Sequence, residues 1–352
     1  MNDLEKEIWQ MRDRYLGQVR SFFQDRGFLE VTTPIMNPWS TPEPFLHPFF
    51  VSSASPPDSR TTAFESSPES KAPAAPSTAS LITSPEFNLK ILWARLKSDL
   101  FEIAHCFRDR ESGSHHSAEF LMLEWYWGQD ERRTIDLIFE LISALSQTLL
   151  PGNEQHPPES HPNRRNNPEL LIRSVDGLFK ENLDIGLTFE ELRDECLERG
   201  HFQHDKPDVL KDRSYEEFFF TLFLNYVEPA LNPRSVTAIH GYPDELAAYA
   251  TVENHRARRF EIYWKGLELA NGYFELRDPA EQRRRMKEEA RVKERSTGRK
   301  PVLPDQFLQS MEMGLPEGSG VALGLERLLM ALTDRSDIRQ ISPFPSIPDD
   351  PG

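Results

Sequence analysis

Two apolar runs, LFEIAHCFR at 100–108 and EFLMLEWYW at 119–127, flank the polar segment DRESGSHHSA at 109–118. Each run has the length and composition of a β-strand, and the polar segment between them is typical of a hairpin loop. Because successive side chains of a strand point to opposite faces, Glu124 and Tyr126 share one face. The pattern predicts an antiparallel hairpin that holds a carboxylate beside a phenol. Such a carboxylate needs a cation, either a ligand or a structural arginine.

The sequence on both sides of this hairpin mixes helical and strand-like periods. Apolar positions at three- and four-residue steps predict helices, and alternating or β-branched runs predict strands. The combination predicts an α+β fold built on an antiparallel sheet. Helices are expected at 4–26, 85–96, 131–150, 279–297 and 325–332, strands at 28–33, 236–248 and 258–276, and a mainly helical region at 169–235.

Residues 51–80 differ in composition from the rest of the chain. Nine serines, five prolines and six alanines fill 20 of these 30 positions. Such a segment cannot bury enough apolar surface to offset chain entropy, so we expect a disordered insert in a surface loop. Residues 151–168 are a second Pro/Asn-rich loop.

The composition limits the class of protein. The chain has 352 residues and a net charge of −16, which disfavours nucleic acid as a partner because phosphates would be repelled on average. It holds no apolar run of about 18 residues and no secretory signal at its start, so no membrane association is expected. Two cysteines, Cys106 and Cys196, are too few for a disulfide framework and favour a reducing cytoplasm. Cys106 is expected to be a small buried apolar residue.

The run GSGVALGLERLLM at 318–330 combines glycines with an arginine. Glycines allow a flat or charged ligand to approach the backbone closely. Arg327, one turn into the following helix, can face the same ligand and bind phosphate with its planar fork of donors. The alternative is a tight strand–helix turn with a surface arginine.

The run FEIYWKGLELANGYFEL at 260–276 places Glu261, Glu268 and Glu275 seven residues apart among apolar and aromatic residues. Buried carboxylates need a metal, a cationic substrate or an arginine. A solvated face is the alternative, which the aromatic neighbours disfavour.

Together these runs resemble the class II aminoacyl-tRNA synthetases. The resemblance covers nearly the whole chain outside 51–80, and it implies a single catalytic domain over 1–352 with an antiparallel sheet flanked by helices. FLEVTTP at 28–34 is similar to motif 1, CFRDRE and AEFLMLEWY at 106–126 to motif 2, and GSGVALGLERLLM to motif 3. The segments similar to the lysyl branch are TSPEF at 83–87, GLELANGYFEL at 266–276 and IRQISPFPSIP at 338–348.

Motif 1 lies close to the start of this sequence, whereas lysyl-tRNA synthetases carry an anticodon-binding domain of about a hundred residues before it. The chain therefore resembles the elongation factor P lysine ligases, in which Ser84 and Ala322 match the ligase pattern. This resemblance implies activation of lysine or (R)-β-lysine by ATP, transfer to a lysine of elongation factor P, and a homodimer formed through motif 1. The extra methyl of Ala322 favours the β-amino isomer. Two alternatives stay open: an enzyme that acts on tRNA, which the charge disfavours, and a weakened paralogue that only binds amino acid or nucleotide.

The resemblance also implies a role for each matching residue. Arg108 would bridge the substrate carboxylate and the α-phosphate, Arg327 would hold the γ-phosphate, and Glu268 would complete the catalytic set. Mg²⁺ would be held by Glu261 and Glu268. The amino acid would be bound by Ser84, Pro85, Glu86, Glu124, Tyr126, Asn271, Glu275 and Ala322. ATP would be bound by Arg108, Asp109, Arg110, Glu111, Ser117, Glu268, Leu269, Gly324 and Arg327.

Motif 2 departs from the family pattern at two positions. The signature F-R-x-E is Phe107-Arg108-Asp109-Arg110 here, and Glu111 follows one residue late. An adenine-side asparagine of the family is Ser117. Either the loop shifts register so that Glu111 serves, or nucleotide binding is weakened. The adjacent His115 and His116 are expected to be solvated on an exposed loop rather than to bind a metal.

Overall fold

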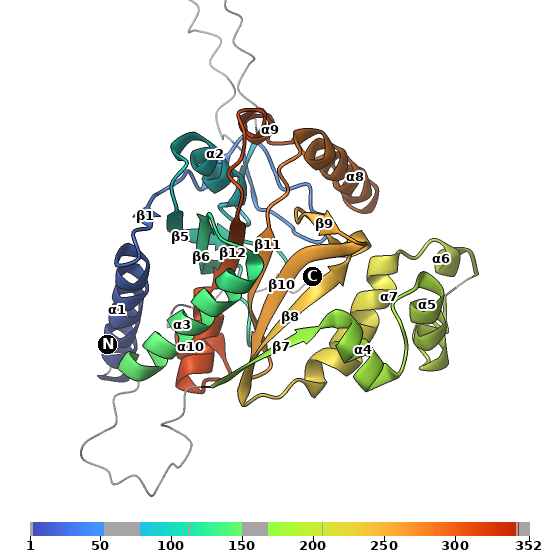
Figure 1. The fold of residues 1–352 in the computed structure, drawn as a ribbon, viewed down its shortest axis with the longest axis horizontal. Helices are drawn as coiled ribbons and strands as arrows, with labels where there is room; N and C mark the ends of the chain where they lie inside the picture. The colour runs from blue at the N-terminus through green and yellow to red at the C-terminus, as the bar shows by residue number, and fades with distance from the viewer. Residues whose placement is uncertain are drawn as a thin grey trace, which may run out of the picture.

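The computed structural model describes residues 3–52, 78–111, 113–149, 168–205, 207–342 and 344. Its centre is a sheet of nine strands, antiparallel except for the pairs β1–β5 and β7–β8 (Figure 1). The expected α+β fold on a mostly antiparallel sheet is confirmed. In spatial order the strands are β1 (Leu29–Glu30), β5 (Leu100–Phe107), β6 (Glu119–Trp127), β12 (Ser319–Gly324), β11 (Leu267–Phe274), β10 (Arg256–Trp264), β8 (Ser235–Pro243) and β7 (Glu169–Ser174), with β9 (Val252–Glu253) beside β10.

Two hairpins form the centre of this sheet. Strands β5 and β6 pair antiparallel from Leu100 opposite Tyr126 to Phe107 opposite Glu119, as their sequence predicts. The region 258–276 is a second hairpin, β10–β11, which turns at Lys265-Gly266, where both residues have positive φ. A two-residue turn of this hand matches the right-handed twist of the strands.

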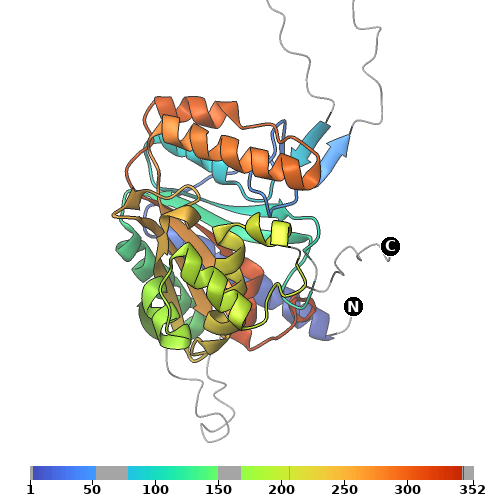
Figure 2. The same cartoon turned by 90° about the vertical axis from the view of Figure 1, so that its right-hand side faces the viewer.

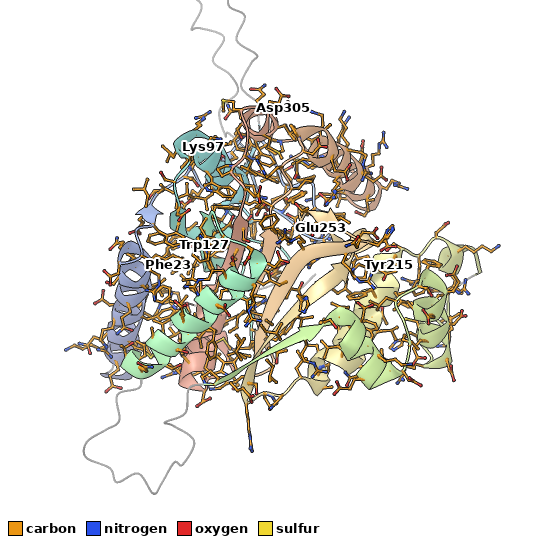
Figure 3. The ribbon with its side chains drawn as sticks, viewed as in Figure 1. Phe23, Lys97, Trp127, Tyr215, Glu253 and Asp305 are labelled. Atoms are coloured by element: carbon orange, nitrogen blue, oxygen red, sulfur yellow. The ribbon has the colours of Figure 1, made fainter. Side chains whose placement is uncertain are left out.

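One face of the sheet is covered by α1 (Asp3–Gln24), α3 (Glu131–Leu149) and α10 (Leu325–Thr333). Their apolar stripes meet the inward residues of the strands in the largest core cluster, where Phe23 of α1 packs against Phe101 and Trp125. Figure 3 shows Phe23 and Trp127 on neighbouring parts of this core, bridged by Phe28. This face is closed by apolar packing, so a ligand has to use the other face.

The second face carries two separate helical groups. The helices α2 (Glu86–Leu96), α9 (Asp305–Glu312) and α8 (Pro279–Thr297) form a layer over the β6 end (Figure 2). The other group packs on β8 and β10, whose residues take part in its apolar cluster. It consists of the helices α4 (Val175–Leu183), α5 (Phe189–Glu198), α6 (Pro207–Lys211) and α7 (Tyr215–Leu222), the π-helical turn 223–227 and the 3₁₀ turns 228–230 and 244–246. A further 3₁₀ turn spans Ile338–Gln340.

Four elements differ from their predictions. The strand expected at 28–33 is formally only two residues long, although the Val31 N–H still bonds the Phe101 carbonyl, since Pro34 ends the pairing. Residues 169–174 are a strand, not part of a helical region, because they pair in parallel with the distant β8. Helix α9 was not predicted. The expected strand 236–248 ends at Pro243 and continues into the turn 244–246.

Both ends of the Ser/Pro/Ala-rich segment 51–80 are ordered, contrary to the prediction of a disordered insert. A three-stranded sheet joins β2 (Met36–Asn37), β4 (Thr78–Leu81) and β3 (Phe50–Ser52), so 51–52 and 78–80 are strand residues. The remainder of the expected insert, 53–77, and most of the expected loop 151–168 lie outside the described residues. Among the described helices, none is long and apolar enough to cross a membrane.

Candidate active site

A cavity of about 220 Å³ lies on the second face of the sheet, between strands β6, β12 and β11 and the segments that precede α2 and follow β2. Most of the residues singled out from the sequence line it. Those at the cavity wall are Ser84, Glu86, Arg108, Glu111, Ser117, Glu124, Tyr126, Glu268, Leu269, Asn271, Glu275, Ala322, Gly324 and Arg327. Their roles as ligands stay predictions.

The strand register explains why residues distant in sequence meet here. Residues directly opposite one another in paired strands share a face. One row crosses the sheet from Glu124 to Ala322 to Asn271 to Glu261, and the next row runs through Tyr126, Gly320 and Tyr273. A Cβ on Gly320 would lie 2.2 Å from the ring of Tyr126, so only glycine fits between Tyr126 and Tyr273 in this second row.

A β-bulge brings Glu268 to this face. Asn271 and Tyr273 of β11, and Glu275 directly after it, alternate along the chain and line the cavity. Glu268 is three residues before Asn271, so a regular strand would turn it to the opposite face. The register shifts between Ile262 and Tyr263, which places Glu268 opposite Tyr263 and on the cavity side.

Two arginines form the basic end of the cavity. Arg108, at the end of the β5 hairpin arm, donates from Nε to the Thr83 carbonyl (3.2 Å), and its guanidinium lies over the Phe120 ring at 5.1 Å. Arg327 donates to the Glu268 carbonyl (3.1 Å) and to Nε2 of His116 (2.5 Å). These contacts fix both guanidinium planes and leave further N–H groups for an anion.

His116 is not the solvated side chain that its loop position predicts. It is half-buried against Arg327, and burial together with the Arg327 charge lowers the pKa of its imidazole. An arginine can only donate, so Nε2 of His116 accepts and the ring is neutral in this arrangement. His116 thus orients Arg327.

A buried ion-pair network forms the floor of the acidic end. Lys90 is 1% exposed, and its Nζ lies 2.5 Å from Glu86 and 2.7 Å from Glu275. Burial alone would lower the pKa of Lys90, but the two carboxylates outweigh it and raise the pKa above its usual value. Burial raises the pKa of Glu275 to about 7, against the attraction of Lys90.

Glu124 lies beside this network with one oxygen unsatisfied. Its Oε1 accepts from the Tyr126 hydroxyl (2.6 Å), whereas Oε2 is buried without a hydrogen-bond partner among the described residues. Burial, and next the negative charge of Glu86, hold the pKa of Glu124 well above its usual value. A buried carboxyl with an open oxygen that faces a cavity is suited to a ligand ammonium.

The motif 2 loop places Glu111 in the cavity and its neighbours outside. Arg110, between Asp109 and Glu111, adopts positive φ. Glu111 lies 3.5 Å from Arg108, while Asp109 and Arg110 are not part of the lining. Glu111 is therefore at the cavity wall, and its role toward the base stays a prediction.

Two other predicted residues also lie outside the lining. Pro85 is the residue before α2 and only sets the path between Ser84 and Glu86. Glu261 is behind the cavity, where it accepts from the hydroxyls of Tyr242 (2.6 Å) and Tyr263 (2.8 Å) and from Arg259 (2.5 Å). Its negative charge still acts on Glu268: burial and then Glu261 raise the pKa of Glu268 to about 7.

Several lining residues were missed from the sequence. Glu43 and Leu46 come from a proline-rich turn with no strand or helix period, and Tyr273 shares its alternation with Asn271 and Glu275, a signal that was available. The pair Glu86–Lys90 has i,i+4 helix spacing, which is equally typical of an exposed pair.

The amino-acid sequence that forms this site matches a family model. The model describes tRNA synthetases class II (D, K and N), and it matches residues 1–348. The chain belongs to this family. The motifs quoted above therefore carry a true relationship, and the sheet and cavity are those of a class II synthetase domain.

The chain is also similar to several proteins named elongation factor P–(R)-β-lysine ligase. It is 32% identical to the elongation factor P–(R)-β-lysine ligase of Haemophilus ducreyi over 336 residues, which are 95% of this chain and 92% of that protein. The ligases of Actinobacillus succinogenes and Pasteurella multocida are 31% and 30% identical over 352 residues, 97% of this chain and 98% of each relative.

Proposed function

We propose that this protein activates (R)-β-lysine or lysine with ATP and transfers the aminoacyl group to a lysine side chain of elongation factor P. The observation that carries the proposal is a cavity with opposite charges at its two ends. Arg108 and Arg327 form one end, and Glu124 with the Glu86–Lys90–Glu275 network forms the other. A diamino acid fits such a cavity in one orientation only, with its carboxylate at the arginines.

In the first step, an oxygen of the substrate carboxylate attacks the α-phosphorus of ATP, and the bond to pyrophosphate breaks. Two anions have to approach each other, so the enzyme's main task is to neutralise and align them. In this proposal Arg108 contacts both the carboxylate and the α-phosphate, and Arg327, oriented by His116, binds the terminal phosphate. The presence of both guanidinium groups at the cavity wall supports these roles. Glu111 would contact the base in the role of the motif 2 glutamate, which its presence at the cavity wall supports.

In the second step, the neutral amine of the acceptor lysine attacks the carbonyl of the adenylate, and AMP leaves with the electrons of the C–O bond. The amide forms when the attacking nitrogen loses its proton. The acidic end continues to bind the aminoacyl side chain during this step, because Glu124 and Tyr126 lie on the rigid strand β6.

The residues fit a magnesium ion that arrives with the nucleotide. Among the described residues, no three His, Cys, Asp or Glu side chains gather as a metal site. Mg²⁺ commonly takes one or two carboxylates and completes its octahedron with phosphates and water. Glu268 would be its ligand from the cavity wall, with the charge of Glu261 behind it. The ion would neutralise phosphate charge.

We also propose a homodimer formed through the motif 1 region and a cytoplasmic location. The exposed apolar side chains Leu29, Ile35 and Met36 follow α1 at the edge of the sheet and support an interface there. Cys106 and Cys196 are both free and buried, as expected of a reducing compartment. A monomer at micromolar concentration in light scattering would contradict the dimer.

The test of the function is a two-stage assay. ATP–pyrophosphate exchange is measured with lysine, with (R)-β-lysine and without amino acid, and transfer to purified elongation factor P or to tRNA is then followed by mass. We expect exchange only with the diamino acids and transfer only to the protein. Transfer to tRNA, or no exchange with either diamino acid, would contradict the proposal.

A further inference from the structure

The segment between β2 and β3 forms one wall of the cavity and is held rigidly. Glu43 and Leu46 of this segment line the cavity. Nζ of Lys293, on α8, donates to the backbone carbonyls of Thr41 (2.8 Å) and Leu46 (2.7 Å). The carbonyl of His47 accepts a hydrogen bond from the motif 2 loop (2.7 Å). A loop fixed at several points can present a side chain as accurately as a strand does.

Glu43 has no cationic partner of its own. Its Oε1 accepts only from the Thr41 hydroxyl (3.0 Å), and no ion pair joins it to any Lys, Arg or His of the described residues. Lys293 is close, but its ammonium donates to the two carbonyls of the loop. Burial and then the negative charge of Glu86 raise the pKa of the Glu43 carboxyl. A partly buried carboxylate in this state is stabilised by a ligand cation.

The acidic groups of the cavity differ in whether a cation pairs with them. Glu86 and Glu275 share the buried ammonium of Lys90, and an arginine pairs with each of Glu111, Glu268 and Glu326. Among the described residues, Glu43 and Glu124 have no ion partner. Glu124 is 1% exposed and keeps one buried oxygen unsatisfied, an independent sign that a ligand group belongs there. The proposed substrate carries two ammonium groups, and the cavity thus offers each of them one uncompensated carboxylate.

The two carboxylates lie toward different ends. The loop that carries Glu43 is joined to the residue after Arg108, because the Asp109 N–H donates to the His47 carbonyl (2.7 Å). Glu124 instead accepts from Tyr126, whose ring centre lies 5.7 Å from Nζ of Lys90. The substrate carboxylate belongs at Arg108, so the amino group nearest that carboxylate is the one within reach of Glu43. The terminal ammonium belongs at Glu124.

We propose that Glu43 binds the amino group adjacent to the substrate carboxylate and sets the preference between lysine isomers. This inference rests on the proposed function. Lysine and (R)-β-lysine share the carboxylate and the terminal amine, and they differ in whether the other amino group is on C2 or C3. A residue that contacts only this group can therefore distinguish the isomers, whereas contacts to the shared groups cannot.

The test combines a variant with a substrate that lacks the group in question. Glu43→Gln removes the charge and keeps the shape, and 6-aminohexanoate has the carboxylate and terminal amine without the third group. ATP–pyrophosphate exchange gives kcat/KM for both diamino acids, and competition against them gives the inhibition constant of 6-aminohexanoate. We expect a loss of about 10- to 100-fold for the preferred diamino acid, the effect of one charged hydrogen bond, and a change within about twofold for 6-aminohexanoate.

Two controls separate this role from a structural one. Glu289→Gln alters a neighbouring acid that accepts from Tyr249 (2.7 Å) and is not part of the cavity lining, so it should leave all the ratios unchanged. Glu43→Asp withdraws the carboxylate by one methylene and should change the ratio between the isomers. Equal losses for 6-aminohexanoate and the diamino acids, or no loss for any of them, would overturn the inference. Wild-type protein without diamino acid activity would refute the proposed function instead.

Discussion

Lys90 provides the most informative test of the cavity floor, because its ammonium compensates two buried carboxylates at once. The substitution Lys90→Met keeps most of the side-chain volume and removes the charge. In the structure Nζ lies 2.5 Å from Glu86 and 2.7 Å from Glu275, and both Lys90 and Glu275 are 1% exposed. The variant leaves these carboxyls with no cation within ion-pair distance among the described residues.

The expected loss is large because the pair is buried. Removing one partner of a buried ion pair costs about 3–5 kcal/mol, since the remaining charge stays in a medium of low polarity. The ammonium also lies 5.4–5.8 Å from the ring centres of Tyr126, Tyr249 and Phe307, and these contacts are lost as well. We expect the free energy of unfolding to fall by about 3–5 kcal/mol near pH 8.

The loss should grow with pH. The pKa of Glu275 is about 7 in the folded protein, above the ordinary 4.5, so its contribution to stability is greatest at low pH and declines until the pH passes 7. Without Lys90 the attraction that lowers this pKa is gone, and the decline continues to higher pH. Between about pH 7 and pH 8 the variant should lose up to about 1 kcal/mol more than wild type.

Urea denaturation followed by tryptophan fluorescence at about pH 6, 7 and 8 measures both quantities. Lys287→Met, an exposed position on α8, is the control and should change stability by less than about 0.5 kcal/mol. The double variant Lys90→Met/Glu275→Gln removes a charge together with its partner and should recover part of the loss. A loss below about 1 kcal/mol for Lys90→Met, or one independent of pH, would refute the reasoning.

Three further outcomes are expected. Arg108→Ala should reduce ATP–pyrophosphate exchange by at least about 100-fold with the protein still folded, and near-normal exchange would remove Arg108 from its role. Ala322→Gly widens the row between Glu124 and Asn271 and should raise the use of lysine relative to (R)-β-lysine, which an unchanged ratio would contradict. Because burial raises the pKa of Glu124, binding of an ammonium beside it should release protons, seen by calorimetry in buffers of different ionisation enthalpy. Glu124→Gln should reduce this release, and equal release from both proteins would argue against it.

The central hairpin could be predicted because its signals are local. Period-two alternation between residues 100 and 127 fixes which side chains share a face, and the Glu124–Tyr126 hydrogen bond follows directly. Strand β7 could not be predicted in the same way. Its residues, ELLIRS, lack clear alternation, and their strand conformation depends on parallel pairing with β8, more than sixty residues later.

The position of Glu268 shows a second limit of sequence patterns. The equal spacing of Glu261, Glu268 and Glu275 suggests one acidic site. In a regular strand, however, two residues seven apart point to opposite faces of the sheet. The hairpin turn and the bulge after Ile262 bring Glu268 back to the cavity face of the sheet. Glu261 remains on the same face but is bound by two tyrosines and Arg259, which a sequence spacing cannot reveal.

The role of Lys90 as the cation at the floor of the site could be recognised only from the three-dimensional structure. Glu86 and Lys90 are four residues apart on a helix, and such pairs are usually exposed and contribute a few tenths of a kcal/mol. Here the helix lies against β6 and α9, so Lys90 is covered by Tyr126 and Phe307 and its charge acts on the whole cavity. Tertiary burial, not spacing, makes the pair important.

The division of charge in the cavity bears directly on which amino acids it can select. A substrate bound in reverse would place its carboxylate against Glu124 and its ammonium against the arginines. Each like-charge contact at 4 Å costs about 4 kcal/mol at an effective dielectric constant of 20, so the reversed orientation is excluded. An apolar amino acid meets a different penalty, because it leaves the buried oxygen of Glu124 without a partner. Orientation is therefore decided by the two ends together, whereas selection of a diamino acid is decided by the carboxylates that Lys90 leaves uncompensated.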